Sequence, residues 1–217
     1  MPDKVKIIII GDEGVGKSAL TLQSLNTQLC LSHFPQSHEP TADDCIRKPI
    51  IVDDEECVVE IIDTAGRDMN VPLTERWIAQ GDAFVLVYSI ASQESFQHVW
   101  KYFEQVREIK RSRSRSQSSG MDGDPLLPVI LVANKHDLRD TREVSRQAGM
   151  GLARELDCEY VETSAKQDTN VEELFVQLVW KVRSQRPTGQ QLLLEKKGIK
   201  TPSRLRKGLN MCKCTVM

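Results

Sequence analysis

The stretch Gly11-Asp12-Glu13-Gly14-Val15-Gly16-Lys17-Ser18 decides the fold of this 217-residue chain. It fits the pattern GxxxxGK[ST] and stands between the apolar run Ile7–Ile10 and a segment with helical periodicity. Glycines let backbone N–H groups approach phosphate oxygens, and the N-terminus of the following helix favours an anion. In this pattern Lys17 reaches the β- and γ-phosphates of a nucleotide, and the Ser18 hydroxyl ligates Mg²⁺. A plain glycine-rich turn is the alternative, which the placement between strand and helix disfavours.

Around this loop, short β-branched runs alternate with longer helical patterns, as is typical of an α/β fold with a mostly parallel sheet covered by helices. The polar turn at 53–56 predicts an antiparallel hairpin of two neighbouring strands. The longest apolar run is far too short to cross a bilayer. Six strands are predicted at 5–10, 49–52, 58–62, 83–88, 129–133 and 160–163, and five helices at 17–29, 73–79, 92–110, 142–156 and 171–186.

Two polar segments interrupt this alternation. Residues 110–125 are rich in arginine and serine, which predicts a disordered surface insertion. That insertion is either a plain solvated loop or a site for a basic-directed kinase or an acidic partner. From 187 onward proline, glycine, lysine and arginine dominate. We therefore expect one domain at 1–186 and a basic, flexible tail at 187–217.

The charge is distributed unevenly along the chain. The net charge is −2, but residues 181–217 hold ten lysines and arginines against one acid. A basic tail on an acidic body indicates an anionic partner for the tail alone. Nucleic-acid binding usually places basic residues on a folded element, whereas a short terminal run that ends in cysteines favours anionic lipid. We therefore expect no nucleic-acid partner.

Three further loops follow predicted strands. Asp63-Thr64-Ala65-Gly66 places an acid where a Mg²⁺-bound water is usually held, with the Gly66 N–H available to a γ-phosphate. In Asn134-Lys135-His136-Asp137, the Asp137 carboxylate can accept both the N1–H and the exocyclic amine of guanine, a donor pair that adenine lacks. In Thr163-Ser164-Ala165-Lys166 the Ala165 N–H can contact the guanine oxygen, although this last signal is weak by itself.

Four such loops in this order resemble the small GTPases of the Ras superfamily. The stretch Pro40-Thr41-Ala42-Asp43-Asp44 and the terminal Cys214-Thr215-Val216-Met217 look like the Ras subfamily. The resemblance implies a P-loop NTPase G domain whose six-stranded sheet has five parallel strands and one antiparallel strand, flanked by five helices. It also implies GTP or GDP as the bound nucleotide, Mg²⁺ as cofactor, and a molecular switch that GTP turns on.

The same resemblance implies the site residues. Phe34 is expected on the edge of the guanine, and Thr41 is expected to join Ser18 on Mg²⁺, with Asp63 acting through a water. The implied catalytic residues are Lys17, Thr41, Gly66 and Arg67. The implied nucleotide-binding residues are Gly11, Asp12, Glu13, Gly14, Val15, Gly16, Lys17, Ser18, Ala19, Phe34, Thr41, Asp63, Gly66, Asn134, Lys135, Asp137, Ser164, Ala165 and Lys166.

Some positions depart from the family pattern. Glu13 replaces a glycine of the phosphate loop, and Arg67 replaces the glutamine that orients the attacking water. Arg67 cannot accept a hydrogen bond from that water, so we expect weak intrinsic hydrolysis. A pairing of Glu13 with Arg67 would instead leave both outside the chemistry. The alternative function is a GTP-loaded pseudo-GTPase scaffold, whereas an ATPase or kinase is disfavoured by Asn134-Lys135-x-Asp137.

The C-terminus carries a lipidation signal. Cys214 lies four residues from the end in a C-a-a-X pattern with Met last, which predicts farnesylation. One lipid chain binds a membrane only marginally, so a second signal is needed, and both Cys212 (palmitoylation) and the basic cluster are candidates. We expect a lipid-anchored monomer on the cytoplasmic face of the plasma membrane. Effectors are expected at 38–46, together with exchange factors and GTPase-activating proteins.

Overall fold

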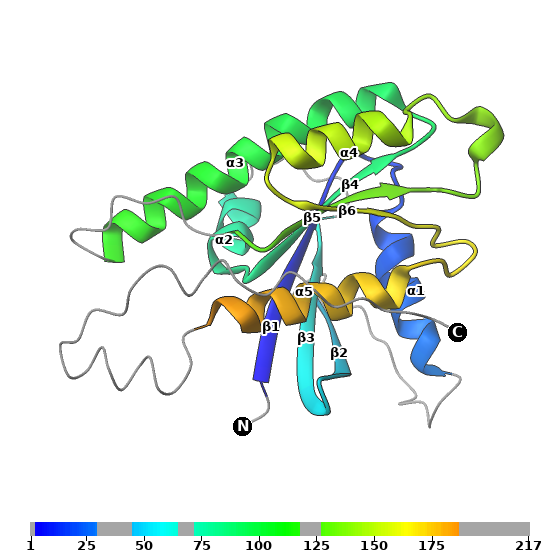
Figure 1. Ribbon diagram of the computed structural model, residues 1–217. Helices are drawn as coiled ribbons and strands as arrows, with labels where there is room; N and C mark the ends of the chain where they lie inside the picture. Colours follow the sequence, from blue (N-terminus) through cyan, green and yellow to red (C-terminus); the bar gives the residue numbers. More distant parts are fainter. Residues whose placement is uncertain (1–2, 30–44, 65–71, 118–126, 187–217) are drawn as a thin grey trace. The chain divides into compact units, whose positions relative to one another are not determined.

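The computed structural model describes residues 3–29, 45–64, 72–117 and 127–186, and it contains a six-stranded sheet with helices on both faces (Figure 1). In chain order the elements are β1 (Asp3–Ile10), α1 (Lys17–Leu29), β2 (Cys45–Val52), β3 (Glu55–Asp63), α2 (Pro72–Gln80), β4 (Ala83–Ser89), α3 (Gln93–Gln117), β5 (Val129–Asn134), the 3₁₀ turn η1 (Arg139–Thr141), α4 (Arg146–Glu155), β6 (Glu159–Glu162) and α5 (Val171–Gln185).

The strand order is β2-β3-β1-β4-β5-β6. All neighbours pair in parallel except β2 and β3, which pair antiparallel from Cys45 opposite Ile62 to Val52 opposite Glu55. The two turn residues between them, Asp53 and Asp54, have φ angles of +53° and +60°, the conformation that a tight two-residue hairpin needs. The predicted fold, with five parallel strands and one antiparallel strand, is confirmed.

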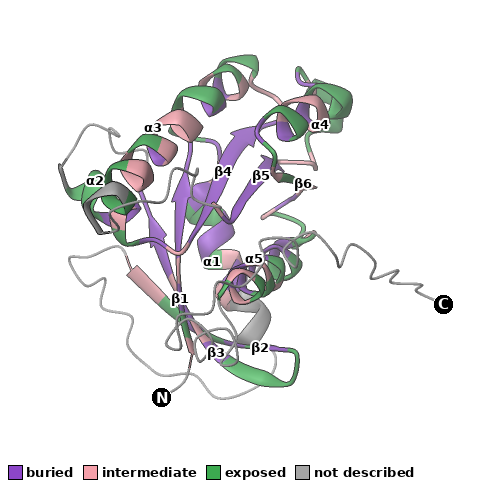
Figure 2. Cartoon of the chain, turned by 60° about the vertical axis from the view of Figure 1, so that its left-hand side comes forward, coloured by how far each residue is buried: buried purple, intermediate pink, exposed green. Residues whose placement is uncertain are grey.

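The central strands are buried on both faces, as their continuous apolar sequences predict. Every residue of β4 and of β5 is buried, and Figure 2 shows these strands enclosed by helices whose outer surfaces are exposed. Because successive side chains of a strand point to opposite faces, β1 contributes to both halves of the core. Ile7 and Ile9 pack with α1 and α5, and Ile8 and Ile10 pack with α2, α3 and α4.

Helix α3 corrects the prediction that residues 110–125 form a disordered loop. The helix continues seven residues past Lys110 to Gln117. Lys110 Nζ donates to the carbonyl oxygens of Ala79 and Gly81, and Arg113 Nη1 donates to Ala79 O across 2.7 Å. These basic groups satisfy carbonyls at the C-terminus of α2, where a helix carries partial negative charge. Residues 118–125 of the predicted loop lie outside the described ranges.

The other boundaries differ by a few residues. The helix predicted from 142 begins only at Arg146, because the Ser145 side chain accepts a hydrogen bond from Ala148 N and caps the helix. Strand β2 begins at Cys45 rather than at 49, and it tolerates Pro49 because it lies at the edge of the sheet.

The chain divides into two units, Met1–Arg183 and Ser184–Met217, and the sheet belongs to the first. Within the described ranges, no helix combines the length and the apolar character that crossing a bilayer requires.

Candidate nucleotide-binding site

The predicted motifs meet at one edge of the sheet. β1, β3, β5 and β6 run in the same direction, so their carboxyl ends share one edge (Figure 1). The phosphate loop follows β1, Asp63 ends β3, Asn134 ends β5 and Thr163 follows β6. Ligands of parallel α/β sheets bind beyond this edge. The topology therefore gathers segments that are far apart in the sequence.

Two glycines of the phosphate loop leave no room for a side chain. A Cβ on Gly11 would lie 2.2 Å from the Val87 carbonyl oxygen, and a Cβ on Gly16 would lie 2.4 Å from Asn134 Nδ2. Gly16 also has a φ of +97°, which other residues rarely adopt. These positions let the loop backbone approach both the sheet and a ligand closely.

Asn134 joins the phosphate loop to the loops after β5 and β6. Its Nδ2 donates to the Val15 carbonyl oxygen across 2.9 Å, and its Oδ1 accepts from Thr163 Oγ1 across 3.1 Å. His136 N donates to Thr163 O across 2.9 Å, and Lys135 adopts a left-handed φ of +64° between them. Strained backbone of this kind persists where neighbouring contacts hold it. The phosphate and base ends of the site are thus connected through one buried side chain.

Lys17 lies in the phosphate loop as an almost fully buried ammonium. Its Nζ donates to the Asp12 carbonyl oxygen across 2.7 Å. Burial lowers its pKa, and the nearby carboxylates of Asp63, Asp12 and Glu13 oppose that shift. A poorly hydrated cation binds a phosphate oxygen strongly, because little water must be removed from it.

Ser18 and Asp63 supply oxygen ligands of the kind that Mg²⁺ prefers. The Ser18 hydroxyl donates to Asp63 Oδ2, and the Asp63 residue is only 8% exposed. Thr64 fixes the end of β3 to β1, since its N and its Oγ1 both donate to Ile9 O, across 3.4 Å and 3.0 Å. An adjacent hydroxyl and carboxylate fit the predicted magnesium site. Thr41, the third predicted residue of that site, lies outside the described ranges.

A hydrogen bond from Ser164 orients the Asp137 carboxylate. Ser164 Oγ donates to Asp137 Oδ1 across 2.6 Å, and Gln167 N in turn donates to Ser164 Oγ across 3.1 Å. The hydrogen bond from Ser164 lowers the pKa of Asp137. The carboxylate is therefore ionised at neutral pH, and each of its oxygens has two lone pairs. Asp137 retains the free acceptor capacity that recognition of a guanine edge requires.

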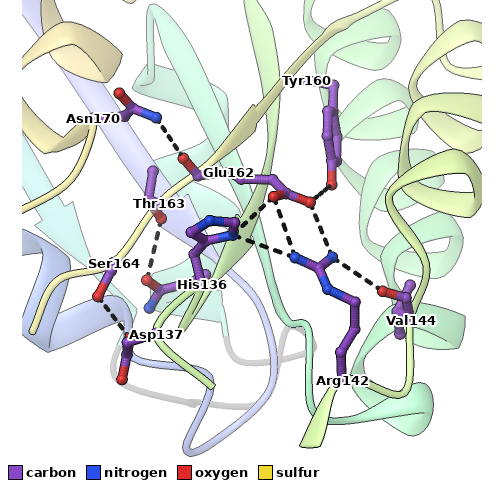
Figure 3. Close-up of polar contacts among 10 residues, drawn as sticks. His136, Asp137, Arg142, Val144, Tyr160, Glu162, Thr163, Ser164 and Asn170 are labelled. Carbon is purple, nitrogen blue, oxygen red and sulfur yellow. Dashed lines mark hydrogen bonds and ion pairs between the residues drawn. The ribbon is translucent and has the colours of Figure 1, made fainter. Parts of the chain in front are cut away.

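An ion-pair network beside this loop was not predicted from the sequence (Figure 3). Glu162, the last residue of β6, accepts from Arg142 across 2.9 Å and 3.2 Å and from Tyr160 OH across 2.8 Å, and His136 Nδ1 lies 2.8 Å from its Oε2. Burial raises the pKa of Glu162, but the hydrogen bonds from Arg142 and Tyr160 outweigh it and hold the pKa below its ordinary value. The network fixes His136, which lies between Lys135 and Asp137 in the loop after β5. The only sequence signal was a charged residue at the end of a strand.

Three further predicted site residues are described, and several others lie outside the described ranges. Ala19 is exposed on the first turn of α1, Ala165 is partly buried, and Lys166 is exposed after β6. Phe34, Thr41, Gly66, Arg67, the stretch 38–44 of the effector segment, and the lipidation candidates Cys212 and Cys214 all lie outside the described ranges. Glu13 is exposed, and the alternative that it pairs with Arg67 involves a residue outside the described ranges.

A phosphate loop between β1 and α1 and an Asn-Lys-x-Asp loop after β5, on a sheet of this topology, define a P-loop G domain. The family model for the Ras family matches residues 6–184. Protein ras-2 of Neurospora crassa is 44% identical over 193 residues, which cover 85% of this chain and 82% of the relative. Ras-like protein B of Aspergillus fumigatus is 42% identical over 85% of this chain and 80% of the relative. Ras-like protein 1 of Pyricularia oryzae is 43% identical over 83% of this chain and 76% of the relative.

The chain belongs to the Ras family, and it is a small GTPase of the signalling-switch type. The family and the fold expected from the sequence are thereby confirmed. The roles of the individual site residues stay predictions, which the geometry supports by bringing the described ones together.

Proposed function

We propose that this small GTPase is a lipid-anchored GTP/GDP switch with weak intrinsic hydrolysis. The observation that carries the proposal is the bridge made by Asn134, which links the loop that holds Lys17 to the loop that holds Asp137. A guanine nucleotide spans these two ends of the site. Its phosphates bind the loop N–H groups and the Lys17 ammonium, and its base binds the Asp137 carboxylate.

Mg²⁺ completes the proposed site. When bound, the ion neutralises part of the charge on the β- and γ-phosphates. Ser18 and Thr41 would hold it, with Asp63 acting through a water. The hydroxyl of Ser18 is already turned toward Asp63, so the chain itself keeps both groups oriented for the ion. Lys17 lies near the carboxylates of Asp63 and Asp12, and its ammonium stabilises negative charge on the phosphates.

Weak hydrolysis follows from two residues. Arg67 has five N–H donors and no acceptor, so it cannot receive a proton of the attacking water in a hydrogen bond as a glutamine does. Glu13 adds an exposed side chain to the phosphate loop, where the arginine of an activating protein would have to enter. Such an arginine is worth about 10³–10⁵ in rate. GTP therefore persists on the protein for longer than it would if hydrolysis were fast.

A single-turnover assay tests this function. The full chain is loaded with GTP, hydrolysis is started with Mg²⁺, and the rate is compared with that of the double variant Glu13→Gly/Arg67→Gln. We expect slow turnover in the unmodified protein and faster turnover in the double variant. Equal rates in both proteins would refute the assigned roles of Glu13 and Arg67. No turnover in either protein, despite tight GTP binding, would favour the alternative of a pseudo-GTPase scaffold.

The tail is proposed to anchor the switch to the cytoplasmic face of the plasma membrane. Farnesylated Cys214 supplies one signal, and acylated Cys212 or the basic cluster supplies a second, with about 1 kcal/mol from each basic residue near anionic lipid. The protein is proposed to act as a monomer that binds effectors through 38–46 and is controlled by exchange factors and GTPase-activating proteins. Cell fractionation tests the anchor: Cys214→Ser should move the protein from the membrane to the soluble fraction.

A further inference from the structure

The phosphate loop is attached to helix α3 through the side chain of Asp12. His98 Nδ1 lies 2.8 Å from Asp12 Oδ2, and the Tyr102 hydroxyl donates to Asp12 Oδ1. A carboxylate only accepts hydrogen bonds, so the histidine nitrogen also donates. His98 and Tyr102 are four residues apart on α3 and therefore project from the same face of the helix. Each carboxylate oxygen of Asp12 thus has a donor from α3.

The backbone of the same residue holds the phosphate-binding lysine. The Asp12 carbonyl oxygen accepts from Lys17 Nζ across 2.7 Å. Asp12 therefore connects two groups that the sequence separates widely: the α3 donors hold its carboxylate, and its carbonyl orients Lys17. The side chain that α3 holds and the carbonyl that Lys17 contacts therefore belong to the same residue.

The chemistry of the loop explains why this carboxylate must be held. A loop that binds phosphates here carries two adjacent acids, Asp12 and Glu13. A carboxylate repels a bound phosphate, the more so where water is partly excluded, and the Asp12 side chain is only 19% exposed. The two donors hold the Asp12 carboxylate on the α3 side and stabilise its charge there. Glu13, by contrast, is exposed.

We propose that His98 and Tyr102 are positioning residues for nucleotide binding, which hold the Asp12 carboxylate against α3 and away from the phosphates. The inference rests on the proposed function, since it concerns the affinity of the same site. Both residues act through Asp12 rather than by touching the nucleotide. They also make the conformation of α3 a determinant of how tightly the nucleotide is held.

The test measures the dissociation rate of fluorescently labelled GDP from the Mg²⁺-loaded full chain. Tyr102→Phe keeps the ring and removes only the hydroxyl, and His98→Leu removes the second donor. The double variant should release GDP about tenfold faster or more, because hydrogen bonds to a charged group are lost. Adding Asp12→Ala to the double variant removes the unheld carboxylate and should slow the release again. A purely structural role of α3 would give no such rescue.

Lys101→Ala, which changes an exposed residue on the same helix, is the matched control and should leave the rate unchanged. Thermal unfolding of every GDP-loaded variant confirms that it is folded. A wild-type release rate in the double variant, or an unchanged fast rate after Asp12→Ala is added, would overturn the inference. Failure of the unmodified chain to bind GDP at all would instead contradict the proposed function, and the inference would fall with it.

Discussion

Asn134 Nδ2 donates to the Val15 carbonyl oxygen across 2.9 Å, although 119 residues separate the two along the chain. Asn134 is 1% exposed, and its Oδ1 accepts from Thr163, so both ends of its amide are satisfied. A short side chain at the end of β5 therefore fixes the phosphate loop after β1 and the loop after β6 at once. The spacing between the phosphate end and the base end of the site is set by these two hydrogen bonds.

Replacement of Asn134 by alanine should loosen this spacing. Two buried hydrogen bonds are lost and the Val15 carbonyl loses the donor that Asn134 supplies, which costs about 1–3 kcal/mol of folding stability. Release of GDP should accelerate as well, because the two ends of the site become uncoupled. Denaturant unfolding and GDP dissociation check both effects. Gln80→Ala removes an exposed amide that accepts from Lys6 Nζ across 3.2 Å and is the control; equal effects of the two changes would contradict the assigned bridge.

The ion pair between Glu162 and Arg142 predicts a pH dependence of stability. The pKa of Glu162 in the folded protein lies below its ordinary value of 4.5, so the unfolded chain binds this proton more readily than the folded one. The stabilisation from this group is complete above about pH 4.5 and is lost as the pH falls through the lower, folded-state pKa. Melting temperatures measured across this range should fall less steeply in Glu162→Gln than in the unmodified protein.

The control for this pH dependence is Glu159→Gln, which removes a carboxylate that pairs with Lys181 and is 52% exposed. Its melting curves should follow those of the unmodified protein, because an exposed pair contributes little. An unchanged pH slope in Glu162→Gln would show that another group carries the acid sensitivity.

The basic end of α3 should stabilise α2. Arg113→Ala removes the donor that lies 2.7 Å from Ala79 O, and a cation at a helix C-terminus is worth about 0.3–1 kcal/mol. Burial lowers the pKa of Lys110, the other donor to the same carbonyl, so that ammonium is already poorly hydrated. Hydrogen exchange of the α2 amides should speed up in Arg113→Ala. Glu108→Ala, an exposed change on the same helix, should leave it unaltered.

The sequence predicted the parts of the molecule that depend on local patterns. Short apolar runs predicted β4 and β5, because both faces of these strands are buried. The loop motifs predicted Lys17 and Asp137, because each motif consists of a few residues that are close together in the sequence. The helical continuation of α3 to Gln117 was missed, since an arginine–serine run has no apolar periodicity. Its contacts are with α2, which only the folded chain brings near.

The attachment of the phosphate loop to α3 was missed for a related reason. Asp12 was predicted as one member of a loop, whereas its partners His98 and Tyr102 are 86 and 90 residues away and belong to no motif. Glu162 and His136 likewise come into contact only because β5 and β6 pair in the sheet. Long-range pairs of polar side chains leave no periodic signal in one sequence, so only the fold shows them.

The most direct test of the central claim is a competition between GTP and ATP for the full chain in the presence of Mg²⁺. The unmodified protein should prefer GTP by about 10⁴-fold or more, because ATP leaves the Asp137 carboxylate without its donor pair. Asp137→Asn should lose this preference and bind xanthosine triphosphate instead, since the new amide donates where guanine also donates. Equal affinity of the unmodified protein for ATP and GTP would contradict the assignment of a guanine-specific switch.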